Sequence, residues 1–91
     1  MKNYHVGYLD VDGDPVAVFT DSAADCRPGN IMVYARMGEH AEADIAWVRQ
    51  QPLASLTLSA PLHEYLARRY SDPPGECEAV NLVIDQGAVP R

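Results

Sequence analysis

The 91-residue sequence contains a single lysine, Lys2, and carries a net charge of −6 from 13 acidic and 7 basic residues. A protein that binds nucleic acid needs a basic face that displaces counterions from phosphates. Only Arg68 and Arg69 place two cations side by side. The composition therefore argues against direct nucleic-acid binding, whereas an acidic surface favours basic partners or simply solubility.

Long apolar runs and cysteine motifs are also missing. No run approaches the roughly 18 apolar residues that cross a membrane, and the first residues, Met-Lys-Asn-Tyr-His, lack the apolar segment of a signal peptide. The two cysteines, Cys26 and Cys77, lie far apart and form no Cys-x-x-Cys motif. We therefore expect a cytoplasmic protein whose cysteines act as small apolar residues, unless the fold brings them together as a disulfide.

The motifs that announce catalysis or nucleotide binding do not occur. The sequence has no Gly-x-Ser-x-Gly elbow, no Walker loop, no Gly-x-Gly-x-x-Gly and no His-Glu-x-x-His. A domain of this length also has little room for a deep pocket beside its own core. We expect no enzymatic activity and no cofactor.

What the sequence does contain begins with a β-hairpin. Residues 4–10 alternate, with Tyr4, Val6 and Tyr8 on one face and a mixed, more exposed face opposite. Asp12-Gly13 is a hairpin turn, and 16–20 is the returning strand. The following connection, 21–30, can form one helical turn capped by Asp21 before Pro28-Gly29 breaks it.

The central stretch switches from strand to helical spacing. Residues 31–36 predict a third strand, Met37-Gly38 a bend, and 39–51 a helix that ends at Pro52. The helix prediction depends on apolar residues three and four apart: Ala41, Ile45 and Val48.

The C-terminal third predicts a second helix and a last strand. Residues 53–58 fit either a short edge strand or an irregular connection. Ser59 is the expected cap of the helix, with Pro61 in its first turn and apolar residues repeating at 62, 66 and 70. Residues 78–85 alternate as a strand, and 86–91 lack periodicity and are expected to fray.

Together these segments predict one α+β domain over residues 1–91. The order is strand–strand–strand–helix–helix–strand (β-β-β-α-α-β). We expect a two-layer sandwich in which two helices cover one face of a four-stranded, mostly antiparallel sheet. The other sheet face would then be open to water or to a partner.

The candidate functional residues are acids and strand tyrosines. Five acids and no base occur between residues 10 and 25, and they would form one negative patch if the hairpin turn and the next connection lie close together. Tyrosines on the strands would line the open sheet face, and an apolar face rimmed by acids is suited to docking. The partner-binding residues predicted on this basis are Asp10, Asp12, Asp14, Asp21, Asp25, Tyr4, Tyr8 and Tyr34.

The functional expectation is a small, acidic, non-catalytic protein-interaction module, with a protein partner or self-association through the open sheet face as its mode of action. One alternative is an inhibitor of a DNA- or RNA-binding protein, of the type found in phages and mobile elements, whose carboxylates imitate phosphates. A continuous acidic stripe would favour that alternative. A second alternative is a small metal-binding protein, because His40 and Asp44 would share one helix face.

Overall fold

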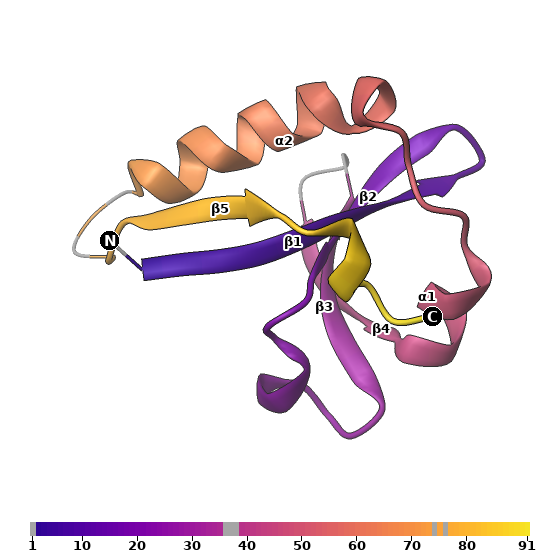
Figure 1. Ribbon diagram of the computed structural model, residues 1–91. Coiled ribbons are helices and arrows are strands. Elements are labelled where there is room, and N and C mark those ends of the chain that lie inside the picture. Colours follow the sequence, from indigo (N-terminus) through magenta and orange to yellow (C-terminus); the bar gives the residue numbers. More distant parts are fainter. Residues whose placement is uncertain (1, 36–38, 74, 76) are drawn as a thin grey trace.

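The computed structural model describes residues 2–35, 39–73, 75 and 77–91. It shows an α+β fold built on a five-stranded sheet with strand order β4-β3-β2-β1-β5. Neighbouring strands are antiparallel except β1 and β5, which run parallel. The α+β class and the mostly antiparallel sheet with two helices are as predicted, but the sheet has one strand more than expected (Figure 1).

The N-terminal hairpin is confirmed. β1 (Lys2–Val11) and β2 (Asp14–Phe19) pair around a two-residue turn in which Asp12 and Gly13 have positive φ angles of 54° and 88°. These angles match the right-handed twist of the strands, and glycine adopts them without steric cost. The Asp10 carboxylate accepts a 2.8 Å hydrogen bond from the Gly13 N–H and so fastens the turn.

The extra strand replaces the first half of the expected helix over 39–51. β3 (Asn30–Ala35) pairs with β4 (Glu39–Asp44), and only Ile45–Gln50 is helical, as α1. The 39–44 segment also alternates with period two, and pairing with β3 satisfies its backbone groups, so tertiary context overrides helix propensity. Asp44 ends the strand and caps α1 by accepting a hydrogen bond from the Ala46 N–H. The expected bend at Met37-Gly38, and the end of the third strand at Arg36, lie outside the described residues.

The second helix begins one turn earlier than predicted. α2 spans Leu56–Ser71, and its cap is Ser55, whose side chain accepts from the Leu58 N–H. Ser59, the expected cap, is buried inside the helix and donates to the Ser55 carbonyl. Neither structure expected for residues 53–58, a short edge strand or an irregular connection, describes the whole segment. Ser55 is the cap of α2, and 56–58 belong to its first turn.

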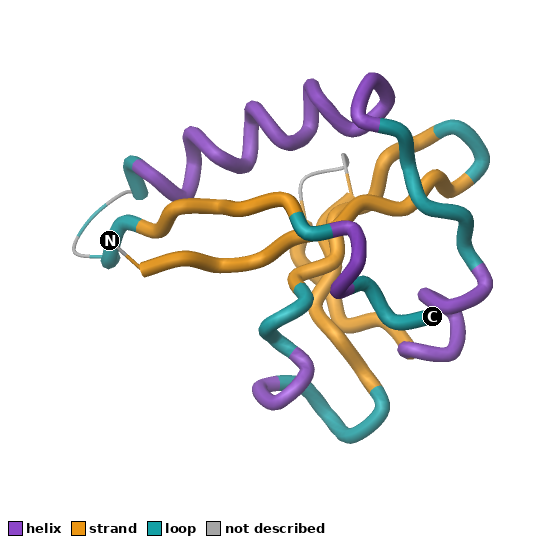
Figure 2. Tube along the Cα trace, in the orientation of Figure 1, coloured by secondary structure: helices purple, strands orange, loops and turns teal. Residues whose placement is uncertain are grey.

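The two helices contribute to different layers. Leu62 and Leu66 of α2 pack with alternate strand residues such as Tyr8 and Ala17, whereas Val48 of α1 packs with Leu9 and other residues of the opposite parity. Successive strand side chains point to opposite sides of a sheet, so both of its faces are covered. Figure 2 shows α2 lying along one side of the strands, with α1 and the C-terminal segment on the other. The sheet face expected to be open is thus closed, and Gly7 and Leu9, expected on the more exposed side of β1, are buried.

The C-terminal segment completes this second layer. After β5 (Val80–Ile84) the chain forms a short 3-10 turn, Gln86–Ala88, and Val89 is only 3% exposed. The Gln86 side-chain amide donates to the carbonyls of Tyr8 and Ala54. The expectation that 86–91 frays is wrong. The segment has no regular apolar spacing, but the hydrogen bonds of Gln86 and the burial of Val89 hold it against the sheet. Among the described residues, no helix is long and apolar enough to cross a membrane.

Candidate functional site

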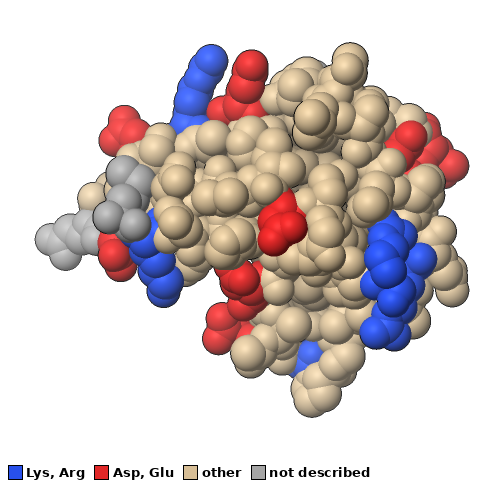
Figure 3. Space-filling model, viewed as in Figure 1, with Lys and Arg blue, Asp and Glu red and all other residues tan. Residues whose placement is uncertain are grey.

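The five predicted acids separate into two groups. Asp10, Asp12 and Asp14 surround the hairpin turn at one end of β2, whereas Asp21 and Asp25 follow its other end. The five residue steps of β2 alone place roughly 17 Å between the groups. Figure 3 likewise shows acidic side chains at separate places on one face of the molecule. The single negative patch expected from the sequence is therefore not formed.

Two of the three predicted tyrosines belong to the core. Tyr8 and Tyr34 are 0% and 2% exposed beneath α2, so they cannot line an exposed docking face. The Tyr8 hydroxyl forms a 2.8 Å hydrogen bond with Nδ1 of His63, and burial raises the pKa of Tyr8 well above its ordinary value. Tyr4, near the start of β1, remains 37% exposed.

The His40–Asp44 pair is also separated. Both residues lie on β4 rather than on a helix, and four strand steps put roughly 13 Å between them. His40 instead bonds the Tyr70 hydroxyl through Nε2 at 2.6 Å, and burial together with the Arg69 charge lowers its pKa. Over the described ranges no group of three or more His, Cys, Asp or Glu side chains could hold a metal ion. Cys26 and Cys77 are both free thiols.

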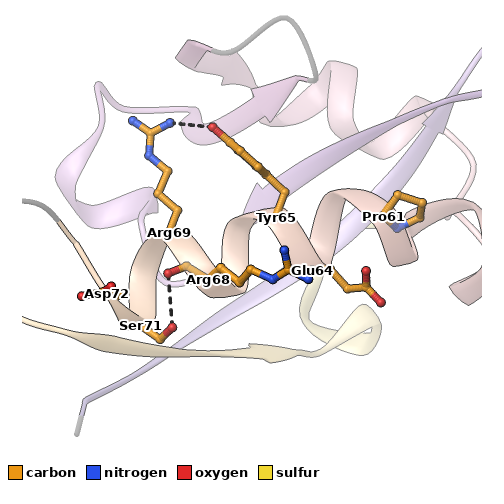
Figure 4. A pocket seen from close by; sticks show the side chains of 7 residues that line it. All are labelled: Pro61, Glu64, Tyr65, Arg68, Arg69, Ser71 and Asp72. Carbon is orange, nitrogen blue, oxygen red and sulfur yellow. Dashed lines mark hydrogen bonds between the residues drawn. The ribbon is translucent and has the colours of Figure 1, made fainter.

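Two hollows formed by described residues are large enough to be considered as candidate sites. The larger, about 770 Å³, runs along the outside of α2 between Pro61 and Asp72. Figure 4 shows that its lining side chains project from this one helix, with Arg69 donating to the Tyr65 hydroxyl at 3.2 Å. A single convex helix does not enclose a ligand, so this hollow is an open surface rather than a site.

The second hollow is smaller but is built from several elements. It has a volume of about 490 Å³, within the usual range of ligand sites. Its walls come from the start of β1, the end of β2, the 3-10 turn Ala23–Asp25, β3 and the end of α2. We call it the partner groove, and its lining residues are Lys2, Asn3, Tyr4, His5, Phe19, Asp21, Ser22, Asp25, Cys26, Met32 and Tyr70.

A polar pair lies at the junction of β1 and the connection after β2. Asp21 Oδ2 accepts hydrogen bonds from both the ring Nδ1 of His5, at 2.8 Å, and the His5 backbone N–H, at 2.9 Å. These two bonds lower the pKa of the Asp21 carboxyl. The expectation that Asp21 caps a helical turn is wrong, because its carboxylate faces β1 and the short turn has no side-chain cap. The pair fixes the direction in which the connection leaves the sheet.

Ser22 holds the wall that carries Asp25 and Cys26. Its hydroxyl donates to the Phe19 carbonyl at 2.7 Å and accepts from the Met32 N–H at 2.9 Å. This one side chain therefore joins the ends of β2 and β3, and the wall is fastened to the sheet on two sides.

The partner groove brings together three of the eight predicted residues: Tyr4, Asp21 and Asp25. Sequence reasoning missed the remaining lining residues, above all His5. The hairpin turn contained a usable signal, because a two-residue loop at 12–13 pairs 11 with 14 and so places 4 opposite 21. Following that register would have put Tyr4 and His5 beside Asp21.

Comparisons of the chain with protein-family models, with curated proteins and with solved structures give no match.

Proposed function

We propose that this protein is a non-catalytic interaction module, acting in the cytoplasm, and that the partner groove receives a segment of another protein. The observation that carries the proposal is the makeup of the groove: aromatic and apolar side chains from β1, β2, β3 and α2 stand beside the carboxylates of Asp21 and Asp25. Apolar lining with a few placed polar groups is the usual composition of a binding site.

The walls of the groove are fastened to the sheet by side-chain hydrogen bonds. The His5–Asp21 pair and the two bonds of Ser22 fasten its walls before a partner arrives. A preorganised site loses less conformational entropy on binding, which favours recognition of a short segment. The free thiols of Cys26 and Cys77 are in keeping with a reducing compartment.

The alternatives receive less support. The separation of the acids at the two ends of β2 gives no continuous stripe along that strand for an inhibitor that imitates nucleic acid. Self-association through an open sheet face lacks its surface, because both faces are covered. A metal site on His40 and Asp44 lacks the proximity that shared coordination needs.

Photo-crosslinking tests the proposal. Ala24 is exposed and precedes Asp25 in the groove wall, and it is replaced by a benzophenone amino acid; the matched control carries the same group at exposed Ala60 on α2. In an extract of the source cell we expect an adduct from position 24 and none from position 60. Excess wild-type protein should abolish the adduct, whereas excess Asp25→Lys should not.

The controls make the result specific to the groove. Asp12→Lys, which reverses the same charge at the hairpin turn, should compete as well as the wild type. Equal adducts from both positions, no adduct, or equal competition by Asp25→Lys and Asp12→Lys would each contradict the proposal.

A further inference from the structure

A cation of the protein's own chain already lies against an aromatic ring of the partner groove. The Lys2 ammonium is 5.3 Å from the centroid of the Tyr4 ring, and both residues line the groove. This distance is within the range in which the negative face of an aromatic ring attracts a cation. The ring face of Tyr4 is therefore accessible to a positively charged group.

The carboxylates of the groove are suited to the same kind of group. Asp21 uses one oxygen, Oδ2, in its recorded bonds to His5, which leaves its second oxygen available as an acceptor. Among the described residues, the Asp25 carboxylate makes no hydrogen bond or ion pair and is exposed. Ring faces and carboxylates that line one hollow form a setting in which a cation gains both interactions.

The aromatic and carboxylate lining of the groove favours arginine over lysine. Tyr4 and the half-buried Tyr70 supply the accessible aromatic surface of the groove. Phe19, only 6% exposed, packs edge to face against Tyr70 with ring centroids 5.7 Å apart and supports that ring from below the surface. A guanidinium is planar and weakly hydrated, so it stacks on rings and donates to carboxylates in fixed directions. An ammonium is a compact and strongly hydrated charge that gains less from either surface.

We infer that the partner groove recognises an arginine side chain in the partner segment, an inference that rests on the proposed function. We also infer that Lys2 competes with this arginine for the Tyr4 ring. The Lys2 ammonium then limits the affinity of the groove for the arginine side chain. An incoming guanidinium takes the ring face from Lys2 and reaches the carboxylates of Asp21 and Asp25.

The test uses three peptides that differ in one side chain. Ac-Gly-Tyr-Arg-Gly-NH2, the same peptide with citrulline, the neutral isostere of arginine, and the same peptide with lysine are each titrated into the full chain, and the amide resonances of the groove residues are followed. We expect the arginine peptide to shift the resonances of Tyr4 and Cys26, and the citrulline and lysine peptides to bind more weakly. Equal binding of the arginine and citrulline peptides, or no binding by either, would overturn the inference.

Four variants locate the interaction. Asp25→Asn should weaken arginine-peptide binding about ten-fold, because the amide oxygen still accepts a hydrogen bond but lacks the charge that strengthens it. Asp12→Asn removes the same charge at the hairpin turn and should leave the affinity unchanged. Lys2→Met should strengthen binding about two- to five-fold, in line with the strength of an exposed cation–ring contact. Lys2→Arg retains the cation and should not strengthen it, and a Lys2→Met variant that binds no better than the wild type would refute the competition.

Failure of this inference can be distinguished from failure of the proposed function. If the crosslink from position 24 forms but excess arginine peptide does not reduce it, the groove binds a partner by other chemistry and the arginine inference alone is wrong. If no groove-specific crosslink forms, the proposed function itself fails.

Discussion

Both faces of the sheet are buried, but by different kinds of side chain. The face beneath α2, which we call the aromatic face, contains Tyr8, Phe19 and Tyr34 together with hydrogen-bonded histidines at its margin. The opposite face, the aliphatic face, is formed by Leu9, Val16, Val18, Ile31, Val33, Val48 and Val89. The clustered side chains of the aliphatic face contribute through packing alone, whereas those of the aromatic face must also keep polar groups paired. The difference predicts that stability depends on side-chain volume on one face and on protonation on the other.

The largest expected effect comes from the aliphatic face. Leu9 is fully buried, so Leu9→Ala should lower the free energy of unfolding by about 2–5 kcal/mol through lost apolar burial and a residual cavity. Leu56→Ala is the matched control, because it makes the same chemical change at a side chain that is 67% exposed. It should alter the free energy of unfolding by less than about 0.5 kcal/mol. Urea denaturation measures both. Equal effects would show that the aliphatic cluster is not a packed layer.

The next largest effect on stability is expected at the contact between β1 and the C-terminal segment. A Cβ on Gly7 would overlap Cγ2 of Val89 and lie 3.0 Å from the Gln86 side-chain oxygen. Gly7→Ala should therefore cost about 1–3 kcal/mol through overpacking. Adding Val89→Ala should recover part of this loss, which a double-mutant cycle measures. Simple addition of the two single losses would refute the contact.

A smaller effect is expected on the aromatic face. Tyr8→Phe keeps the ring but removes the hydroxyl that bonds His63 at 2.8 Å. We expect a loss of about 1 kcal/mol, the usual net value of such a hydrogen bond. Thermal and urea unfolding of the variant and of the wild type provide the measurement. Unchanged stability would mean that the hydrogen bond makes no net contribution to the free energy of unfolding.

The smallest effect is a dependence on pH just below 6.5, which the histidines of the aromatic face should produce and the aliphatic face should not. Burial lowers the pKa of His40 and of His63 below the ordinary value of 6.5, aided at His40 by Arg69 and opposed at His63 by Glu64. The unfolded chain therefore binds protons more readily, so stability should fall as the pH drops through 6.5 and below. His63→Gln should reduce this slope of unfolding free energy against pH. Leu9→Ala should lower the whole curve and leave its slope unchanged, and a changed slope in Leu9→Ala would break the comparison between the faces.

Local signals in the sequence were sufficient for much of the fold. Asp12-Gly13 specifies its turn by itself, because positive φ angles there suit glycine and aspartate. The apolar run at 16–20 and the alternation at 80–84 are visible without any partner. Residues 39–44 fit both a helical stripe and a strand, and the choice depended on whether β3 was available beside them. The site was predicted only in part. Tyr8 and Tyr34 were placed on an open face because nothing in their spacing tells which sheet face a helix will cover.

The sequence by itself determined the α+β class, the hairpin and the acidic balance, since each follows from neighbouring residues or from composition alone. Tertiary structure decided that both faces of the sheet are covered, that the acids separate, and that Tyr4, His5, Asp21 and Asp25 line one groove. The physical reason is that backbone propensity acts between near neighbours, whereas burial and side-chain pairing depend on which distant segments the folded sheet brings together.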